Sequence, residues 1–235
     1  MAEPLTLPGG PPRAVVVDLD DTIFPQAAYL AGAARAVGRA AQDAGLDADV
    51  VAAALKRQLR AGSDRGATID RALAACGVPP ARIAELVPAL VAAFIGYQPD
   101  ILPRYPGADT ALAALRRRYP LACLTDGNPD IQRAKLTATG VADAFDAVVI
   151  TDELGGRTSR KPRPDGLLKI AQLFDVPPDA LVVIGDRPGK DIAAASAVGA
   201  RSIRVRTGEY ADAPDEPPAT VVVPDLAAAA AALGA

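Results

Sequence analysis

Hydrophobic and polar positions follow two different patterns along this chain. The apolar run AVVVDLD, which begins just after Arg13, is typical of a buried strand. From Phe24 to about Gln98, apolar positions instead recur with helical spacing in Ala-rich segments, which are separated by breaks at DAGLDAD, AGSDRG and CGVPPAR. This stretch therefore predicts about four helices and no strand.

Beyond residue 99, strand-like and helix-like segments alternate. The strand-like segments are PLACLTD, FDAVVIT, ALVVIGD, ARSIRVR and TVVVPD. The helix-like segments are DTALAALRRR, PDIQRAKLTATG, PDGLLKIAQLF, KDIAAASAVG and LAAAAAALG. Such alternation predicts right-handed βαβ units and a parallel sheet.

Together the two patterns predict how the chain is divided. Residues 13–23 and 99–235 are expected to form an α/β core with a doubly wound, Rossmann-like parallel sheet. Residues 24–98 are expected to form an all-helical insert directly after the first strand. The Pro- and Gly-rich residues 1–12 are expected to form a flexible N-terminal tail.

Charge and hydropathy restrict the partners. The formal net charge is −3 and no run of five or six like charges occurs, which argues against a nucleic acid polymer or an anionic membrane as partner. The first residues lack the cationic start and apolar stretch of a signal peptide, and no apolar stretch of about eighteen residues follows. We therefore expect a cytoplasmic protein that acts on a small molecule, with a homodimer as an open alternative.

The residue types exclude several classes of chemistry. The chain has no histidine, which removes Ser-His-Asp and Cys-His catalysis, phosphohistidine chemistry and His-ligated zinc. Two cysteines, Cys76 and Cys123, are too few for a disulfide scaffold or a structural zinc site, and both are expected to be small buried hydrophobic residues. Catalysis must therefore use carboxylates, lysine or hydroxyl groups.

Polar side chains follow the predicted strands, at the place where open α/β sheets bind ligands. Asp18 and Asp20 follow the first strand and Asp186 a later one, and the loops 125–128 and 160–162 add further polar groups. Two carboxylates that are two residues apart at a buried strand end repel each other unless a cation compensates. Asp18 and Asp20 therefore predict a metal site.

Four segments in this order resemble motifs one to four of the haloacid dehalogenase superfamily: VVVDLDDT, LACLTDGN, SRKPRPD and VVIGDRPGKD. The resemblance extends from about Arg13 to Leu226, and superfamily members with a helical cap carry it between motifs one and two, where residues 24–98 lie. More narrowly, YQPDILPRYPGA and TDELGGRTSRKPRPD resemble the branch of bacterial pyrimidine 5′-nucleotidases and flavin mononucleotide phosphatases.

The resemblance implies a mechanism. Asp18 would be the nucleophile that forms an aspartyl-phosphate, and Mg²⁺ would be held by the carboxylates of Asp18 and Asp186 and the main-chain carbonyl of Asp20. The Asp20 side chain would protonate the leaving alkoxide and then activate water. One carboxylate kept ionised by metal beside another kept protonated is a known way to separate two pKa values.

The resemblance also implies a phosphate-binding set. It comprises the Thr125 hydroxyl, backbone N–H groups in the turn of Asp126, Gly127 and Asn128, and the Lys161 ammonium. Taken singly, Thr125 or Asp126 is also compatible with an N-cap of the next helix. Asp191 could support the metal site or cap the helix KDIAAASAVG.

These features predict a Mg²⁺-dependent phosphatase acting on a small phosphate monoester, with a nucleoside 5′-monophosphate as the leading substrate. The superfamily's dehalogenases and phosphonate hydrolases generally lack an acid at the position of Asp20. A phosphomutase or other phosphotransferase with the same core, and a non-catalytic ligand-sensing module, remain the alternatives.

The helical insert is expected to be a lid that closes over Asp18, hinged at Phe24-Pro25 and at Pro99 to Pro106. Its basic and aromatic side chains could contact the leaving group, although exposure on the cap surface is the simpler interpretation for each. They are Arg35, Arg39, Lys56, Arg57, Arg60, Arg65 and Tyr97.

Overall fold

The computed structural model describes residues 7–8, 10–63 and 65–235. The chain divides into two compact units, of which one is Ala27–Asp100 and the other joins the described residues up to Gln26 with Ile101–Ala235. Of the expected N-terminal tail, residues 1–6 and 9 lie outside the described part. Leu7 is buried, and its backbone N–H donates to the carbonyl of Ala232 at 3.0 Å, so this residue is held against the C-terminal helix.

The larger unit is built on one six-stranded sheet in the order β3-β2-β1-β4-β5-β6, and every neighbouring pair is parallel. The strands are β1 (Ala14–Val17), β2 (Leu121–Thr125), β3 (Ala147–Ile150), β4 (Leu181–Gly185), β5 (Arg201–Val205) and β6 (Val221–Val223). This is the order of a doubly wound sheet. The predicted fold class is confirmed.

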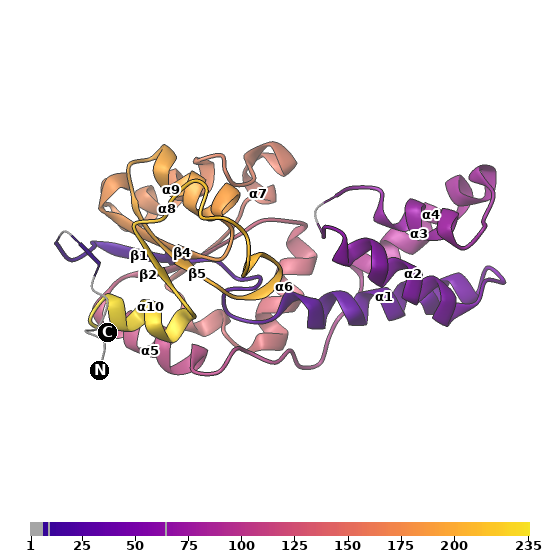
Figure 1. Ribbon diagram of the computed structural model, residues 1–235, viewed down its shortest axis with the longest axis horizontal. Helices are drawn as coiled ribbons and strands as arrows, with labels where there is room; N and C mark the ends of the chain where they lie inside the picture. Colours follow the sequence, from indigo (N-terminus) through magenta and orange to yellow (C-terminus); the bar gives the residue numbers. More distant parts are fainter. Residues whose placement is uncertain (1–6, 9, 64) are drawn as a thin grey trace. The chain divides into compact units, whose positions relative to one another are not determined.

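Helices cover both faces of the sheet (Figure 1). They are α5 (Ala108–Arg118), α6 (Pro129–Thr139), α7 (Asp152–Gly155), α8 (Asp165–Phe174), α9 (Ala193–Ala197) and α10 (Leu226–Ala232). Single turns of 3-10 helix occur at η1 (Ala142–Ala144), η2 (Gly156–Ser159), η3 (Pro178–Ala180) and η5 (Gly208–Tyr210). Helices α8 and α9 lie on one face, and α5 and α10 lie on the other.

Both faces of the central strands are buried, which explains their nearly unbroken apolar sequences. Every residue of β1, β2 and β4 is buried. Ala14 and Val16 of β1 pack in a cluster with Leu167 and Ile170 of α8, while Val15 and Val17 must point to the opposite face because side chains alternate along a strand. Cys123 is fully buried in β2, as expected, whereas Cys76 is only partly buried.

The segment KDIAAASAVG differs from the single helix that its pattern predicts. It begins within a π-helical turn, η4 (Pro188–Ile192), and becomes α-helical only in α9. The carbonyl of Arg187 accepts hydrogen bonds from the backbone N–H groups of Lys190, Asp191 and Ile192, which widens this turn. Turns of this kind occur frequently at functional sites.

The smaller unit contains the four predicted helices: α1 (Gln26–Gln42), which begins at the last residue of the larger unit, α2 (Ala48–Arg60), α3 (Thr68–Ala75) and α4 (Pro80–Ile95). Its described residues contain no strand. One side chain from each helix enters a common apolar cluster, namely Val37, Leu55, Leu73 and Leu90. This unit therefore has a hydrophobic core of its own.

The cap side chains named from the sequence are mostly at the surface of this unit. Arg35, Arg39, Arg57, Arg60 and Arg65 are exposed, whereas Lys56 and Tyr97 are partly buried. The Tyr97 ring lies 5.4 Å from that of Tyr29, measured between ring centres. Among the described residues, no helix is both long and apolar enough to cross a membrane.

Candidate active site

The site lies where the strand order reverses, at the carboxyl ends of β1 and β4. These strands are neighbours, and Val17 pairs with Ile184, so Asp18 and Asp186 follow paired positions by one and two residues. Val17 also pairs with Cys123 of β2, which brings the end of β2 at Thr125 to the same edge. A reversal of strand order is where doubly wound sheets bind their ligands.

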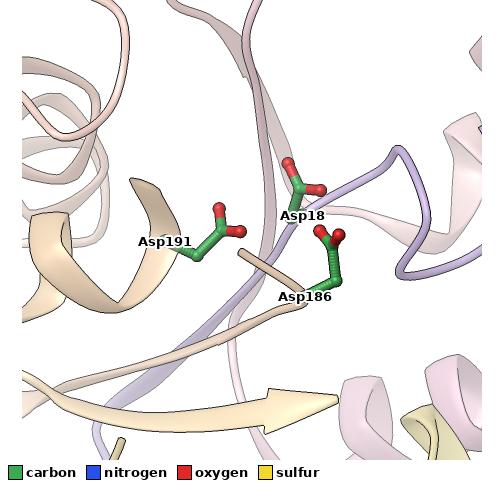
Figure 2. A group of neighbouring side chains, drawn as sticks. All are labelled: Asp18, Asp186 and Asp191. Atoms are coloured by element: carbon green, nitrogen blue, oxygen red, sulfur yellow. The ribbon is translucent and has the colours of Figure 1, made fainter. Parts of the chain in front are cut away.

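Three buried carboxylates converge there: Asp18, Asp186 and Asp191 (Figure 2). They are only 6%, 1% and 1% exposed, and one oxygen from each lies within 4.8 Å of the others. Both side-chain oxygens of Asp186 are buried without a hydrogen-bond partner among the described residues. Buried oxygens of this kind call for a bound ion or another ligand.

The electrostatics of this cluster fit a cation. Burial raises the pKa of Asp18 to about 7 against the opposing effect of Lys161, and the Asp191 carboxylate adds to the rise. Burial, Asp191 and Asp18 raise the pKa of Asp186 well above its ordinary value. A set of carboxylate oxygens suits a hard divalent ion such as Mg²⁺, whose charge would remove this repulsion. The residues present therefore fit the ion that the sequence predicts.

Lys161 joins two of the three carboxylates. Its Nζ lies 2.5 Å from Oδ1 of Asp18 and 2.7 Å from Oδ1 of Asp191, and it donates to the carbonyl of Leu124 at 3.2 Å. Burial opposes its charge, but the carboxylates of Asp18 and Asp191 outweigh burial and raise its pKa. A buried ammonium thus lies directly beside the predicted nucleophile.

The turn after β2 is shaped by its own side chains. Oδ1 of Asp126 accepts hydrogen bonds from the Thr151 hydroxyl at 2.9 Å and the Lys161 backbone N–H at 3.1 Å. The Asn128 side chain accepts from the backbone N–H groups of Asp130 and Ile131, which makes Asn128 the N-cap of α6. Of the helix-cap alternatives considered from the sequence, neither Thr125 nor Asp126 is the cap.

Asp191 lies with the carboxylates at the strand ends. It accepts a hydrogen bond from the backbone N–H of Arg187 at 3.0 Å in addition to its contact with Lys161. A Cβ atom added to Gly185 would lie 2.4 Å from Cγ of Asp191, so the glycine makes room for this side chain. These contacts tie Asp191 to Lys161 and to the turn after Asp186.

The Asp20 side chain contacts a different part of the core. Its two oxygens each lie 2.7 Å from Nζ of Lys135, and Oδ2 lies 3.3 Å from Nε2 of Gln132. Both partners are on α6 and 3% exposed. No sequence motif indicated a role for these partners, although the polar residues Asn128, Gln132, Lys135 and Thr139 recur at helical spacing from the end of the second motif.

Asp21 also has structural contacts that the sequence did not indicate. It has a positive φ of 55°, and its carboxylate accepts from the backbone N–H groups of Gln26 at 2.9 Å and Glu209 at 3.1 Å. The Thr207 hydroxyl donates to its carbonyl. Asp21 therefore ties the loop after β5 to the loop after β1, which carries Asp20.

The family profile described as haloacid dehalogenase-like hydrolase matches residues 12–199. This chain belongs to the haloacid dehalogenase-like hydrolases. A glyceraldehyde 3-phosphate phosphatase from Methanopyrus kandleri is 33% identical over 85% of the chain and 86% of that protein. Pyrimidine 5′-nucleotidase YjjG from Escherichia coli is 32% identical over 43% of the chain and 44% of that protein.

Solved structures of this hydrolase family agree on the fold. The putative HAD-hydrolase YfnB from Bacillus subtilis, in a form bound to magnesium, has a TM-score of 0.71 at 18% identity and covers 96% of this chain and 100% of that one. The family match and the phosphatase relative confirm the predicted superfamily and its hydrolase class.

Proposed function

We propose that this hydrolase is a Mg²⁺-dependent phosphatase that acts on a small phosphate monoester through an aspartyl-phosphate on Asp18. One observation carries the proposal: Lys161 pairs with Asp18 and Asp191, and these two carboxylates converge with the unpartnered carboxylate of Asp186. This arrangement offers a nucleophile, a cation for phosphoryl oxygens and oxygen ligands for a metal in one buried place.

Asp18 begins the reaction. Its carboxylate oxygen attacks phosphorus, a bond from that oxygen to phosphorus forms, and the bond from phosphorus to the ester oxygen breaks. Asp20 donates its proton to the departing oxygen, so the product is a neutral alcohol. The Lys161 ammonium and the backbone N–H groups of residues 126–128 hold the phosphoryl oxygens as their charge redistributes.

Water completes the reaction. Asp20, now a carboxylate, takes a proton from a water molecule whose oxygen attacks phosphorus, and the bond to Asp18 breaks to release inorganic phosphate. The carboxylates of Asp18 and Asp186 and the main-chain carbonyl of Asp20 would hold Mg²⁺, which when bound supplies positive charge against the phosphoryl oxygens.

The relatives favour a small substrate. The relative named for glyceraldehyde 3-phosphate matches most of the chain, including the helical unit, whereas the one named for pyrimidine nucleotides matches less than half. We therefore expect glyceraldehyde 3-phosphate to be a better substrate than the nucleoside 5′-monophosphate that the sequence favours. The helical residues 24–98 would form the lid that admits such a substrate.

The test is phosphate release from p-nitrophenyl phosphate, glyceraldehyde 3-phosphate and a set of nucleoside 5′-monophosphates, with Mg²⁺ and with EDTA. We expect turnover that EDTA abolishes and that Asp18→Asn removes for every substrate. Tight binding of a phosphate ester without turnover under any divalent ion would instead indicate a ligand-sensing module. Return of the phosphoryl group to a second sugar phosphate would indicate a mutase.

A further inference from the structure

The Asp20 carboxylate is held by one face of helix α6. Nζ of Lys135 lies 2.7 Å from Oδ1 and 2.7 Å from Oδ2, and Nε2 of Gln132 lies 3.3 Å from Oδ2. Gln132 and Lys135 are three positions apart, so they lie one turn apart on the same side of the helix. Their contacts fix both the position of the carboxylate and the direction in which its oxygens point.

Lys135 is in an environment where a charge is costly. It is 3% exposed, and a buried ammonium needs a compensating partner. Asp20, 115 residues earlier in the sequence, is such a partner. Both of its carboxylate oxygens lie 2.7 Å from the Lys135 ammonium, so the two residues form an ion pair. Since the ammonium is equally close to both oxygens, rotation of the carboxylate would lengthen at least one of these two contacts.

Gln132 connects the same carboxylate to the turn of the second motif. Its Nε2 also donates to the backbone carbonyl of Asp126. Gly127 has a φ of 130°, and a Cβ atom at this position would lie 2.8 Å from Nε2 of Gln132. The absence of a side chain at Gly127 thus leaves space for the Gln132 side chain. The amide of Gln132 then contacts both the backbone of this turn and the Asp20 carboxylate.

We propose that Lys135, assisted by Gln132, is a positioning residue that holds the Asp20 carboxylate in its orientation for proton transfer. This inference rests on the proposed function, in which Asp20 moves a proton in both steps. In the acid step one oxygen of Asp20 carries the proton and the other accepts from Lys135, whereas both oxygens can accept from Lys135 once Asp20 is a carboxylate. Proton transfer requires a carboxylate oxygen within about 3 Å of the reacting oxygen, and a misplacement of about 1 Å can cost about 10²-fold in rate. Lys135 acts through Asp20 and needs no contact with substrate.

The first measurement compares three variants by steady-state kinetics. Lys135→Met should lower kcat by about 10²-fold and leave KM nearly unchanged, since phosphate binding does not depend on Asp20. Lys135→Arg should recover part of the loss because a guanidinium can pair with both carboxylate oxygens. The matched control is Arg133→Met, because Arg133 is on the same helix but exposed and paired with Glu153.

The second measurement is a double-mutant cycle with Asp20→Asn, followed by single-turnover phosphate release. If Lys135 acts through Asp20, adding Lys135→Met to Asp20→Asn should cause little further loss. A further loss of about 10²-fold in the double variant would overturn the inference, as would wild-type kcat in Lys135→Met or a change confined to KM. If Lys135→Met does not fold, Gln132→Met in the same cycle carries the test.

The roles of Asp20 and Lys135 can be refuted separately. If Asp20→Asn alone keeps wild-type turnover, the proposed acid is wrong whatever Lys135 does. If Asp20→Asn loses activity but the cycle is additive, the proposed chemistry stands and the positioning role of Lys135 is wrong.

Discussion

Individual carboxylates differ sharply in their surroundings, and these differences support the separate roles proposed for them. Asp18 is buried between Lys161 and two other carboxylates, whereas Asp20 pairs with Lys135 on another element. A nucleophile must lie beside the phosphorus, while an acid must reach the leaving oxygen. The two residues should therefore respond differently when each carboxylate is replaced by an amide.

Asp20→Asn should lower the rate by about 10²- to 10⁴-fold, the usual cost of losing a general acid or base. The first-step loss should be larger for an alkyl phosphate than for p-nitrophenyl phosphate, because nitrophenolate leaves without a proton. Asp18→Asn should abolish turnover of both. Single-turnover phosphate release measures these effects, and equal, minor losses for Asp20→Asn with both leaving groups would show that Asp20 is not the acid.

Asp186→Asn should stabilise the metal-free protein and weaken its stabilisation by Mg²⁺. Burial and the neighbouring carboxylates make a charge at this position unfavourable without a cation, so the neutral amide should raise the Tm of the metal-free protein. A gain of about 1 kcal/mol corresponds to ~2–4 °C for a domain of this size. Mg²⁺ should raise the Tm of the wild type far more than that of the variant. Thermal unfolding of the two proteins with Mg²⁺ and with EDTA measures these differences. An equal rise in Tm for both proteins would show that Asp186 is not a metal ligand.

At the scale of elements, the turn between β2 and α6 joins the site to the helix that holds Asp20. Its conformation depends on Gly127, whose φ of 130° is rarely adopted by other residues. The Asn128 cap then starts the helix, so that Gln132 and Lys135 face the site. A change at Gly127 should consequently affect chemistry as well as stability.

Gly127→Ala should destabilise the protein by about 1–2 kcal/mol because of the positive φ, and should also lower kcat because the new Cβ displaces Gln132. Gly77→Ala is the matched control, since Gly77 has a φ of 79° and open space around its added Cβ. That variant should lose stability without losing kcat. Urea unfolding and steady-state kinetics measure the two effects, and a wild-type kcat for Gly127→Ala would contradict the role assigned to Gln132.

At the scale of the whole molecule, two compact units with separate hydrophobic cores are joined near Gln26 and Asp100. Two short connections between separately packed units are the arrangement that hinge motion requires. The proposed lid predicts that the units approach each other when the site is filled, because exclusion of bulk water strengthens electrostatic interactions within the site.

Small-angle X-ray scattering should therefore record a smaller radius of gyration with Mg²⁺ and a phosphate analogue such as orthovanadate than with Mg²⁺ alone. Asp18→Asn, which lacks the nucleophile, should respond less to the analogue. An unchanged radius under conditions where the analogue inhibits turnover would contradict closure of the lid.

The sequence by itself determined the strands, most of the helices, the fold class and the motif positions. An apolar run bounded by polar residues specifies a buried strand, so Asp18 and Asp186 could be placed at strand ends before their neighbours were known. Alternation of strands with helices then required a parallel sheet, and the carboxyl ends of parallel strands meet at one edge. These inferences succeed because they depend on local periodicity and on general rules of chain connection.

Only the tertiary structure decided which side chains meet. Lys135 and Asp20 are 115 residues apart, and their contact depends on strand order, on the register of β1 with β2 and on the rotation of α6 about its axis. Asp191, which lies in the π-helical turn η4, likewise contacts Lys161 across 30 residues of sequence. A contact of this kind depends on the relative placement of elements that are far apart in the sequence. The local sequence pattern of either element does not predict this placement, because the packing of the whole core determines it.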